Sequence, residues 1–442
     1  MKFRNFGKAL LIGALSVGAV LSVTSCVQSY TVGYLYVTGT QTAGTTGQGV
    51  LSGFRIDHNT GYLTPINGMP IASGGANPNR AVLLTGSRFV YVLNQGTDAS
   101  GGSNCTSATS PCKNSNIVQF TVGGNGFLTQ QETFFSEGNN PFRVFADSQG
   151  AFLFVLDHDA PDPSTCALAL GPQYTRCGDI TVFKIDPSTG RLSVLLNSQV
   201  TSASGQPLPY FPVPPDPIDV VFAGNYILTL SGTPANGDVV FPYTYTNGQL
   251  TISQNGAQPL GIHQGTAIQY AGAFIYVLDN EPVTVNSITS PSQILPFSIG
   301  SGGALQQQTG GAVPDDPTLS NPLFVLQAAG SNGSKWVYVA NTGDNSSTLN
   351  AQSGIAGYVI DPQTKQLVTM SGSPFGTGAG PQCLVEDPSN QFFYTANFNS
   401  SSVTGLTIDQ NSGVLRPLPG RANLSYTLAG PATYCLINGR TS

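Results

Sequence analysis

A short aromatic and β-branched segment recurs seven times along this chain of 442 residues. Its clearest copy is Phe274–Asn280, which reads Phe-Ile-Tyr-Val-Leu-Asp-Asn. The other copies start with an aromatic residue and end in or beside a small polar residue: Tyr34–Thr38, Phe89–Asn94, Phe152–Asp157, Tyr226–Ser231, Trp336–Asn341 and Phe392–Asn397. Each copy predicts a buried strand that enters a turn. Seven copies indicate repeated units that stack into one body.

Two further strand signals accompany every aromatic strand. A hairpin follows it, most clearly at Ile180–Leu192, where Asp-Pro-Ser-Thr-Gly forms the turn. A short apolar strand that usually starts at a proline precedes it, as in Pro217–Phe222. Four short strands in each of seven repeats, about 28 in all, predict an all-β, seven-bladed β-propeller with four-stranded antiparallel blades.

The order of these signals predicts how the ring closes. The first aromatic strand, at Tyr34, has no preceding strand of its own, and the last such strand, Pro431–Ile437, has no aromatic strand after it. We therefore expect the carboxy-terminal strand to join the amino-terminal blade. A solenoid would instead need capping segments at both ends, which the sequence does not contain.

The amino-terminal 26 residues carry a targeting signal. Lys2, Arg4 and Lys8 precede the apolar stretch Ala9–Val23, a pattern typical of secretory signal peptides. The next residues end in Val-Thr-Ser-Cys and resemble a bacterial lipobox with Cys26 as the lipidated residue. The alternative is an ordinary secretory signal that contains a cysteine. We expect residues 27–442 to form one exported domain in the bacterial cell envelope, held to the membrane by the lipid alone.

The remaining cysteines are even in number, as expected of an exported protein with disulfides: Cys105, Cys112, Cys166, Cys177, Cys383 and Cys435. Six cysteines allow 15 pairings. The local spacings favour Cys105–Cys112 and Cys166–Cys177, which leaves Cys383–Cys435 as the third. The spacing does not fit a zinc site, and we predict no metal or cofactor.

Composition excludes one class of partner. Only 9% of the residues are charged, the formal net charge is −6, and Lys and Arg do not cluster. Nucleic acid binding needs concentrated positive charge, so we do not expect it.

The repeat motifs resemble a known family. Pro-x-x-Val, Tyr-Val-x-Asn and Ile-Asp-Pro-x-Thr-Gly-x-Leu are similar to the YVTN and lactonase-type seven-bladed propellers over roughly residues 32–440. That family includes bacterial 6-phosphogluconolactonase and fungal carboxymuconate cyclase, so the resemblance implies a small lactone or sugar ligand and lactone or ester hydrolysis. WD40 propellers are disfavoured, because the chain has one Trp and no recurring Trp-Asp pair.

Long connections predict where a site would lie. In a propeller, the starts of the first strands and the ends of the second strands meet at one face, and the segments 95–116, 158–179, 199–216 and 281–293 all reach that face. We call it the looped face. Binding residues concentrate on variable loops that a rigid frame holds.

The ring of residues two positions after each proline points to candidate groups around the central channel: Arg80, Arg143, Asp219, Thr266, Phe324, Cys383 and Thr433. The two arginines could bind a carboxylate or phosphate, or polarise a carbonyl. Lactone opening also needs a base. The candidates near the looped face are His158 and His263, with Asp157, Asp219 and Glu281 as binding or orienting groups.

Two functions remain open at this point. One is a hydrolase that uses these groups at the channel mouth. The other is a non-catalytic scaffold that binds a glycan, a peptide or an envelope protein on the looped face. In the second case, Arg80 and Arg143 pair with carboxylates such as Asp219, and the histidines are structural. The segment Asn139–Arg143 lacks the histidine that the family resemblance leads us to expect there, and no Gly-x-Ser-x-Gly motif or P-loop occurs.

Overall fold

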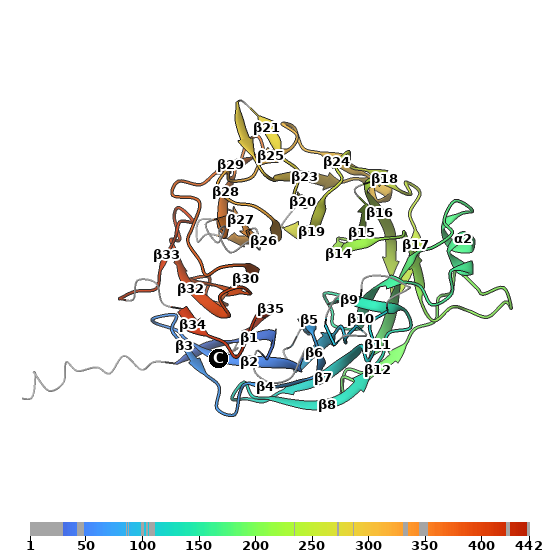
Figure 1. Cartoon of the computed structure of the whole chain (residues 1–442), viewed down its shortest axis with the longest axis horizontal. Helices are drawn as coiled ribbons and strands as arrows, with labels where there is room; N and C mark the ends of the chain where they lie inside the picture. Colours follow the sequence, from blue (N-terminus) through green and yellow to red (C-terminus); the bar gives the residue numbers. More distant parts are fainter. Residues whose placement is uncertain are drawn as a thin grey trace, which may run out of the picture.

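The computed structural model describes residues 30–41, 48–84, 86, 88–98, 101–102, 105, 111–233, 235–271, 274–285, 287–329, 335–343, 352–420 and 425–439. The predicted targeting segment and Cys26 lie outside these residues. The described chain forms seven radial antiparallel sheets in a ring (Figure 1). The predicted all-β, seven-bladed propeller is therefore confirmed. No helix within the described ranges is long and apolar enough to span a bilayer.

The blades are numbered here in chain order, and each uses one sheet. Blade 1 contains β1 (Thr31–Thr40), β2 (Gln48–Asp57), β3 (Leu63–Pro65), β4 (Ile71–Ala76) and β35 (Ala432–Gly439). Blade 2 contains β5 (Pro78–Leu83), β6 (Phe89–Asn94), β7 (Asn116–Val122) and β8 (Leu128–Phe134). Blade 3 contains β9 (Asn139–Ala146), β10 (Phe152–Asp159), β11 (Gly178–Ile185), β12 (Leu192–Val194) and β13 (Phe211–Val213). Blade 4 contains β14 (Pro217–Ala223), β15 (Tyr226–Thr233), β16 (Gly237–Thr246), β17 (Gln249–Ile252) and β18 (Gln258–Pro259).

The second half of the ring follows the same plan. Blade 5 contains β19 (Gly265–Ala271), β20 (Phe274–Asp279), β23 (Gln293–Ile299), β24 (Leu305–Gln307) and β25 (Val313–Pro314). Blade 6 contains β26 (Pro322–Ala329), β27 (Lys335–Asn341), β28 (Gly354–Ile360) and β29 (Leu367–Thr369). Blade 7 contains β30 (Pro381–Glu386), β31 (Phe392–Asn397), β32 (Ser402–Ile408), β33 (Leu415–Pro417) and β34 (Ser425–Thr427). Outside the blades lie the helix α2 (Ser164–Leu170), the turn η1 (Ser301–Gly303) and a hairpin of β21 (Val283–Val285) and β22 (Ile288–Ser290).

The first strand of every blade faces the axis of the ring, and in blade 1 that strand is β35 (Figure 1). Strand β35 pairs antiparallel with β1, and Ile437 of β35 lies opposite Leu35 of β1. The carboxy-terminal strand thus closes the ring, as predicted. A disulfide between Cys383 of β30 and Cys435 of β35 also links blades 7 and 1, and the pairings Cys105–Cys112 and Cys166–Cys177 are confirmed.

In five blades, the outermost strand is divided into two short pieces that pair with the same third strand, for example β12 and β13 on β11. The chain leaves the sheet edge between the two pieces. The sequence signals did not show this division, because pieces of two or three residues are too short to establish a strand periodicity.

The repeated Tyr and Gly residues hold neighbouring blades together. Tyr91 of β6 donates its hydroxyl hydrogen bond to the carbonyl of Gly190, 2.5 Å away in the hairpin turn of blade 3. Three other aromatic strands make the same bond to the next blade: Tyr36 to Gly126, Tyr338 to Gly413, and Tyr394 to Gly61. Gly190 has a φ of +72°, and a Cβ there would lie 2.7 Å from the Phe89 ring. At Gly190, both the backbone conformation and the close packing therefore favour glycine.

Candidate functional site

Three charged side chains from adjacent inner strands meet near the axis. Arg143 Nε of β9 donates to Asp219 Oδ1 of β14 at 2.9 Å, and Arg80 Nη2 of β5 lies 3.8 Å from the same oxygen. The second oxygen, Asp219 Oδ2, accepts a hydrogen bond from the Ile268 backbone N–H of β19 at 3.1 Å. One buried carboxylate thus joins four neighbouring blades, and the predicted pairing of both arginines with Asp219 is present.

The charges in this cluster do not balance. The two arginine side chains are 13% and 15% exposed and share one carboxylate, so one positive charge lacks a partner in this cluster. Burial, followed by the nearby charge of Arg80, lowers the pKa of Arg143 to about 10, against the opposing effect of Asp219. Arg143 still carries its proton at neutral pH. The cluster can therefore bind an anion or stabilise a developing oxyanion.

Aromatic rings lie beside both guanidinium groups. Arg80 Cζ is 4.8 Å from the centroid of the Tyr434 ring, and Arg143 Cζ is 5.0 Å from that of Phe142. These cation–π contacts fix the two groups without neutralising them.

The predicted base His158 lies next to this cluster. Its ring stacks on Phe142 with the centroids 3.8 Å apart and the planes 11° from parallel. Burial and the positive charge of Arg143 lower the pKa of His158 to about 4, against the opposing effect of Asp216. The ring is consequently neutral at pH 7 and can accept a proton, although a pKa near 4 makes it a weak base.

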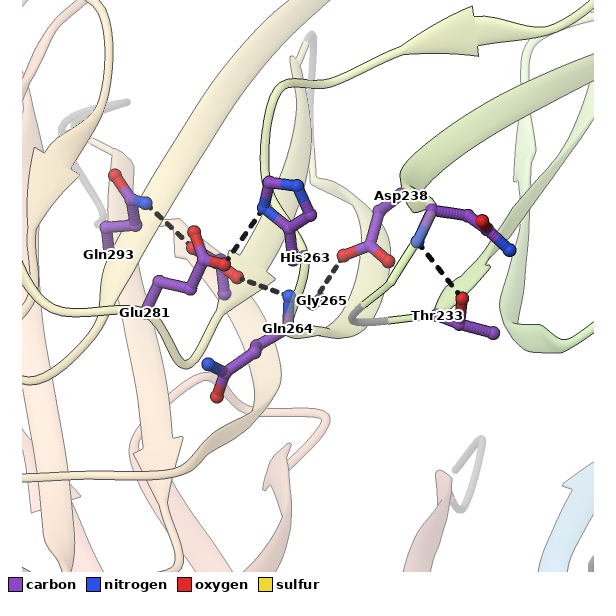
Figure 2. Close-up of polar contacts among 9 residues, drawn as sticks. Thr233, Asp238, His263, Gln264, Gly265, Glu281 and Gln293 are labelled. Atoms are coloured by element: carbon purple, nitrogen blue, oxygen red, sulfur yellow. Dashed lines mark hydrogen bonds and ion pairs between the residues drawn. The ribbon is translucent and has the colours of Figure 1, made fainter.

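His263 belongs to a separate dyad. Its Nδ1 lies 3.2 Å from Glu281 Oε1, and the two side chains are 49% and 25% exposed (Figure 2). Figure 2 also shows the neighbouring carboxylate of Asp238, which accepts the Gly265 N–H at 2.6 Å. Glu281 can orient His263, but no contact among the described residues links this dyad to Arg80 or Arg143.

Some predicted residues have other roles in the structure. Asp157 is fully buried on the second strand of blade 3, where its carboxyl group accepts a hydrogen bond from Ser136. Thr266 and Thr433 donate to the carbonyls of Pro322 and Pro78 in the next blade.

Register also corrects the predicted ring of inward residues. Thr38 and Leu93 are each the fifth residue of their aromatic strands. Tyr434 lies opposite Thr38, and Arg80 lies opposite Leu93. Tyr434, and not Thr433, is therefore the equivalent of Arg80 in blade 1. In blade 5, Ala267 takes this position in place of Thr266. The inner strand has the same irregularity in both blades, but Ala432 of blade 1, and not Pro431, takes the position of Pro78 in blade 2, so a count from Pro431 falls one residue short.

A pocket of about 430 Å³ lies elsewhere, at the outer edge of blade 7. Phe375, Thr377, Thr404 and Leu406 are among the residues that line it, and none of the predicted site residues does. Within the described ranges, no three His, Cys, Asp or Glu side chains are arranged to hold a metal ion.

Comparison with known proteins supports the family resemblance. The sequence model described as "Lactonase, 7-bladed beta-propeller" matches residues 298–428. A periplasmic gluconolactonase from Pseudomonas aeruginosa is 17% identical, with a TM-score of 0.61 over 92% of this chain and 99% of that one. A candidate 6-phosphogluconolactonase from Bacteroides uniformis is 16% identical, with a TM-score of 0.63 and the same coverage. No curated protein matches the chain. The resemblance to lactonase-type propellers is thus confirmed, and at these identities the solved structures establish the fold alone.

Proposed function

We propose that this protein binds a small sugar acid or lactone at the looped end of the axis and opens the lactone ring by hydrolysis. We further propose that the predicted lipobox and signal peptide direct it to the bacterial cell envelope as a lipid-anchored protein. The observation that carries the proposal is the charge imbalance: Arg80 and Arg143 share only Asp219, beside the neutral ring of His158.

The chemistry assigns one role to each group. His158 takes a proton from water as the water oxygen attacks the lactone carbonyl. Negative charge develops on the carbonyl oxygen, where Arg80 and Arg143 stabilise it. The ring C–O bond then breaks, and the proton on His158 passes to the departing ring oxygen. The product is a hydroxycarboxylate, whose charge also suits the arginines, so we expect it to inhibit.

The names of the compared proteins fit this substrate class, because one is a gluconolactonase and the other a candidate 6-phosphogluconolactonase. A second function, the non-catalytic scaffold, has support of its own, because both arginines pair with Asp219 as expected for it. Leu168 of α2 and Ile288 of β22 are 60% and 55% exposed on segments of the looped face. Exposed apolar side chains on loops suit a scaffold that binds a protein or glycan without turnover.

Turnover of a panel of sugar and aliphatic lactones, followed by acid release, tests the proposal on the domain from residue 27 onward. We expect the His158→Gln variant to lose turnover but still bind gluconate in calorimetry, and the Arg80→Gln variant to lose both. Arg88 lies in a turn on the opposite face and contacts only the Phe89 ring among aromatic groups, so Arg88→Gln serves as the matched control.

The outcomes separate the two functions. Equal turnover in wild type and His158→Gln would remove His158 from the reaction. Neither turnover nor binding of any lactone or sugar acid by the folded wild type would contradict the proposal and favour the scaffold.

A further inference from the structure

Two aspartates lie at the neck of the loop that carries α2. Asp157 of β10 and Asp179 of β11 are directly opposite each other in the antiparallel register. Between them, the chain makes the segment 158–178, which includes α2 and the Cys166–Cys177 disulfide. Both aspartates are fully buried, at 0% exposure. The ends of this loop therefore meet at two carboxyl groups that are buried from bulk solvent.

The hydrogen bonds to this pair are incomplete. The Ser136 hydroxyl donates to Asp157 Oδ2, and the Thr181 hydroxyl lies 3.5 Å from Asp179 Oδ2. The other oxygen of each carboxyl, Oδ1, has no hydrogen-bond partner within the described part of the chain. A Cβ added to Gly138 would lie 2.0 Å from Asp179 Oδ1 and 2.8 Å from Asp157 Cγ, so both carboxyl groups border one small space.

The surrounding charges are unfavourable for two carboxylates. No ion pair to either aspartate occurs among the described residues. The neighbouring titratable groups are Glu137, Asp159 and the Tyr210 hydroxyl. Burial first, and then the nearby carboxylates, raise the pKa of Asp157 and Asp179 well above the ordinary value. A pair with both groups ionised would leave two adjacent buried charges uncompensated.

Blade 2 contains the same arrangement with amides. Asn94 and Asn116 are directly opposite each other, and Asn94 Nδ2 donates to Asn116 Oδ1 at 2.9 Å. Ser73 donates to Asn94 Oδ1 at 2.6 Å, as Ser136 donates to Asp157. A Cβ on Gly75 would lie 2.7 Å from Asn116 Oδ1, so Gly75 corresponds to Gly138. An amide N–H supplies the donor in blade 2, and in blade 3 a proton on one carboxyl group would supply the equivalent donor.

We propose that Asp157 and Asp179 share a proton at neutral pH and that this proton fastens the two ends of segment 158–178 together. The arrangement is a pH-sensitive latch. Below the pH at which the proton leaves, the O–H of one carboxyl group donates a hydrogen bond to the opposing carboxylate. Above it, two buried negative charges repel and the neck opens. Because His158 directly follows Asp157 in β10, an open neck also displaces His158 from Phe142.

The sign of the pH effect follows from linkage. The folded state holds the proton at pH values where the unfolded aspartates have released theirs, so folding takes up a proton and stability falls as pH rises. For one proton, the folding equilibrium constant falls by up to tenfold per pH unit once the pH exceeds the pKa of the unfolded aspartates. It levels off once the pH exceeds the pKa of the pair in the folded state.

Urea unfolding between pH 5 and pH 9 tests this latch on the wild type and on Asp157→Asn/Asp179→Asn, which copies the Asn94–Asn116 pair. We expect the folding constant of the double variant, relative to wild type, to rise up to tenfold per pH unit as long as the folded wild type keeps its proton, and to level off once that proton has left. After correction for the intrinsic pH dependence of amide exchange, segment 158–178 should lose protection at alkaline pH in the wild type only.

Two further measurements test the latch without that double variant. Infrared spectra of the wild type at pH 7 should contain a protonated-carboxyl band that shifts in Asp179→Asn. Asn94→Asp/Asn116→Asp should install the same pH dependence in blade 2. An identical pH dependence with and without the Asp157–Asp179 pair would overturn the proposal. The proposal would also be overturned if calcium chloride restored the stability of the wild type at pH 9 and had no effect on the Asp157→Asn/Asp179→Asn variant. A cation would then occupy the space between the two carboxyl groups.

Discussion

Substitution of Gly190 by alanine tests whether the repeated turn glycine holds adjacent blades together. Gly190 has a φ of +72°, and its carbonyl accepts the Tyr91 hydroxyl hydrogen bond from blade 2. A Cβ would lie 2.4 Å from Gln119 Nε2 and 2.7 Å from Phe89 Cδ1. The change therefore introduces backbone strain and a steric clash at once.

The two effects can be estimated separately. A non-glycine residue in the left-handed region costs about 1–2 kcal/mol. Overpacking against the rigid Phe89 ring adds about 1–3 kcal/mol. We therefore expect Gly190→Ala to lower the free energy of unfolding by about 3 kcal/mol, measured by urea denaturation at pH 7.

A matched glycine separates the strain from the clash. Gly224 has a φ of +63° in the β14–β15 turn, and an added Cβ there meets nothing within 4 Å. Gly224→Ala should lose only the strain energy, about 1–2 kcal/mol. If both variants lost the same stability, the packing of Phe89 on Gly190 would not hold the blades together, and the reasoning would fail.

Four other predictions address the ring and the site. Cys383→Ala/Cys435→Ala should lower the unfolding free energy by about 4 kcal/mol in denaturation, because the disulfide spans 52 residues. Lys365→Gly should raise the thermal midpoint, because Lys365 has a φ of +62° in the turn position where other blades have glycine. Asp219→Asn should destabilise the fold by about 3–5 kcal/mol but strengthen phosphate binding in calorimetry, because two arginines then lack a counter-charge. With His158 as the base, lactone turnover should be flat from pH 7 to pH 5 and fall towards pH 4; a fall centred near pH 6.5 would contradict that role.

The fold was predictable because its signals are local. Each aromatic strand reads as a buried β-strand on its own, and the Asp-Pro-Ser-Thr-Gly turn encodes its own geometry. Asp186 Oδ1, for example, accepts the backbone N–H groups of Ser188 and Thr189 at 2.9 and 2.8 Å. Closure of the ring then followed from the order of these signals, and the disulfide pairing followed from the spacing of the cysteines.

The helix α2 was not predicted, because it depends on contacts distant in sequence. Seven residues are too few for a stable isolated helix. Thr165 Oγ1 of α2 lies 2.9 Å from the hydroxyl of Tyr210, which is 45 residues further along the chain. The Cys166–Cys177 disulfide adds a second constraint. Neither contact leaves a helical pattern in the sequence.

The meeting of Arg80, Arg143 and Asp219 near the axis could be predicted by counting from the strand-initial proline. That count fails at Tyr434, because Ala432, and not Pro431, takes the position of Pro78 in blade 1. Stacking of His158 on Phe142 joins side chains from two strands, so no spacing within one strand could indicate it. The stacking matters because it accompanies the burial that keeps the ring neutral.

Closure by β35 determines the order in which the blades are completed during synthesis. A chain delivered amino-terminus first would carry β1 from the start, but its inner neighbour arrives only after the other six blades. The first blade begun is thus the last one finished. Until then the inner edge of β1 is an unpaired strand edge, the kind of surface on which chains aggregate. We expect chaperones to be needed most in this interval, and truncation before Ala432 to leave six finished blades and one permanently open edge.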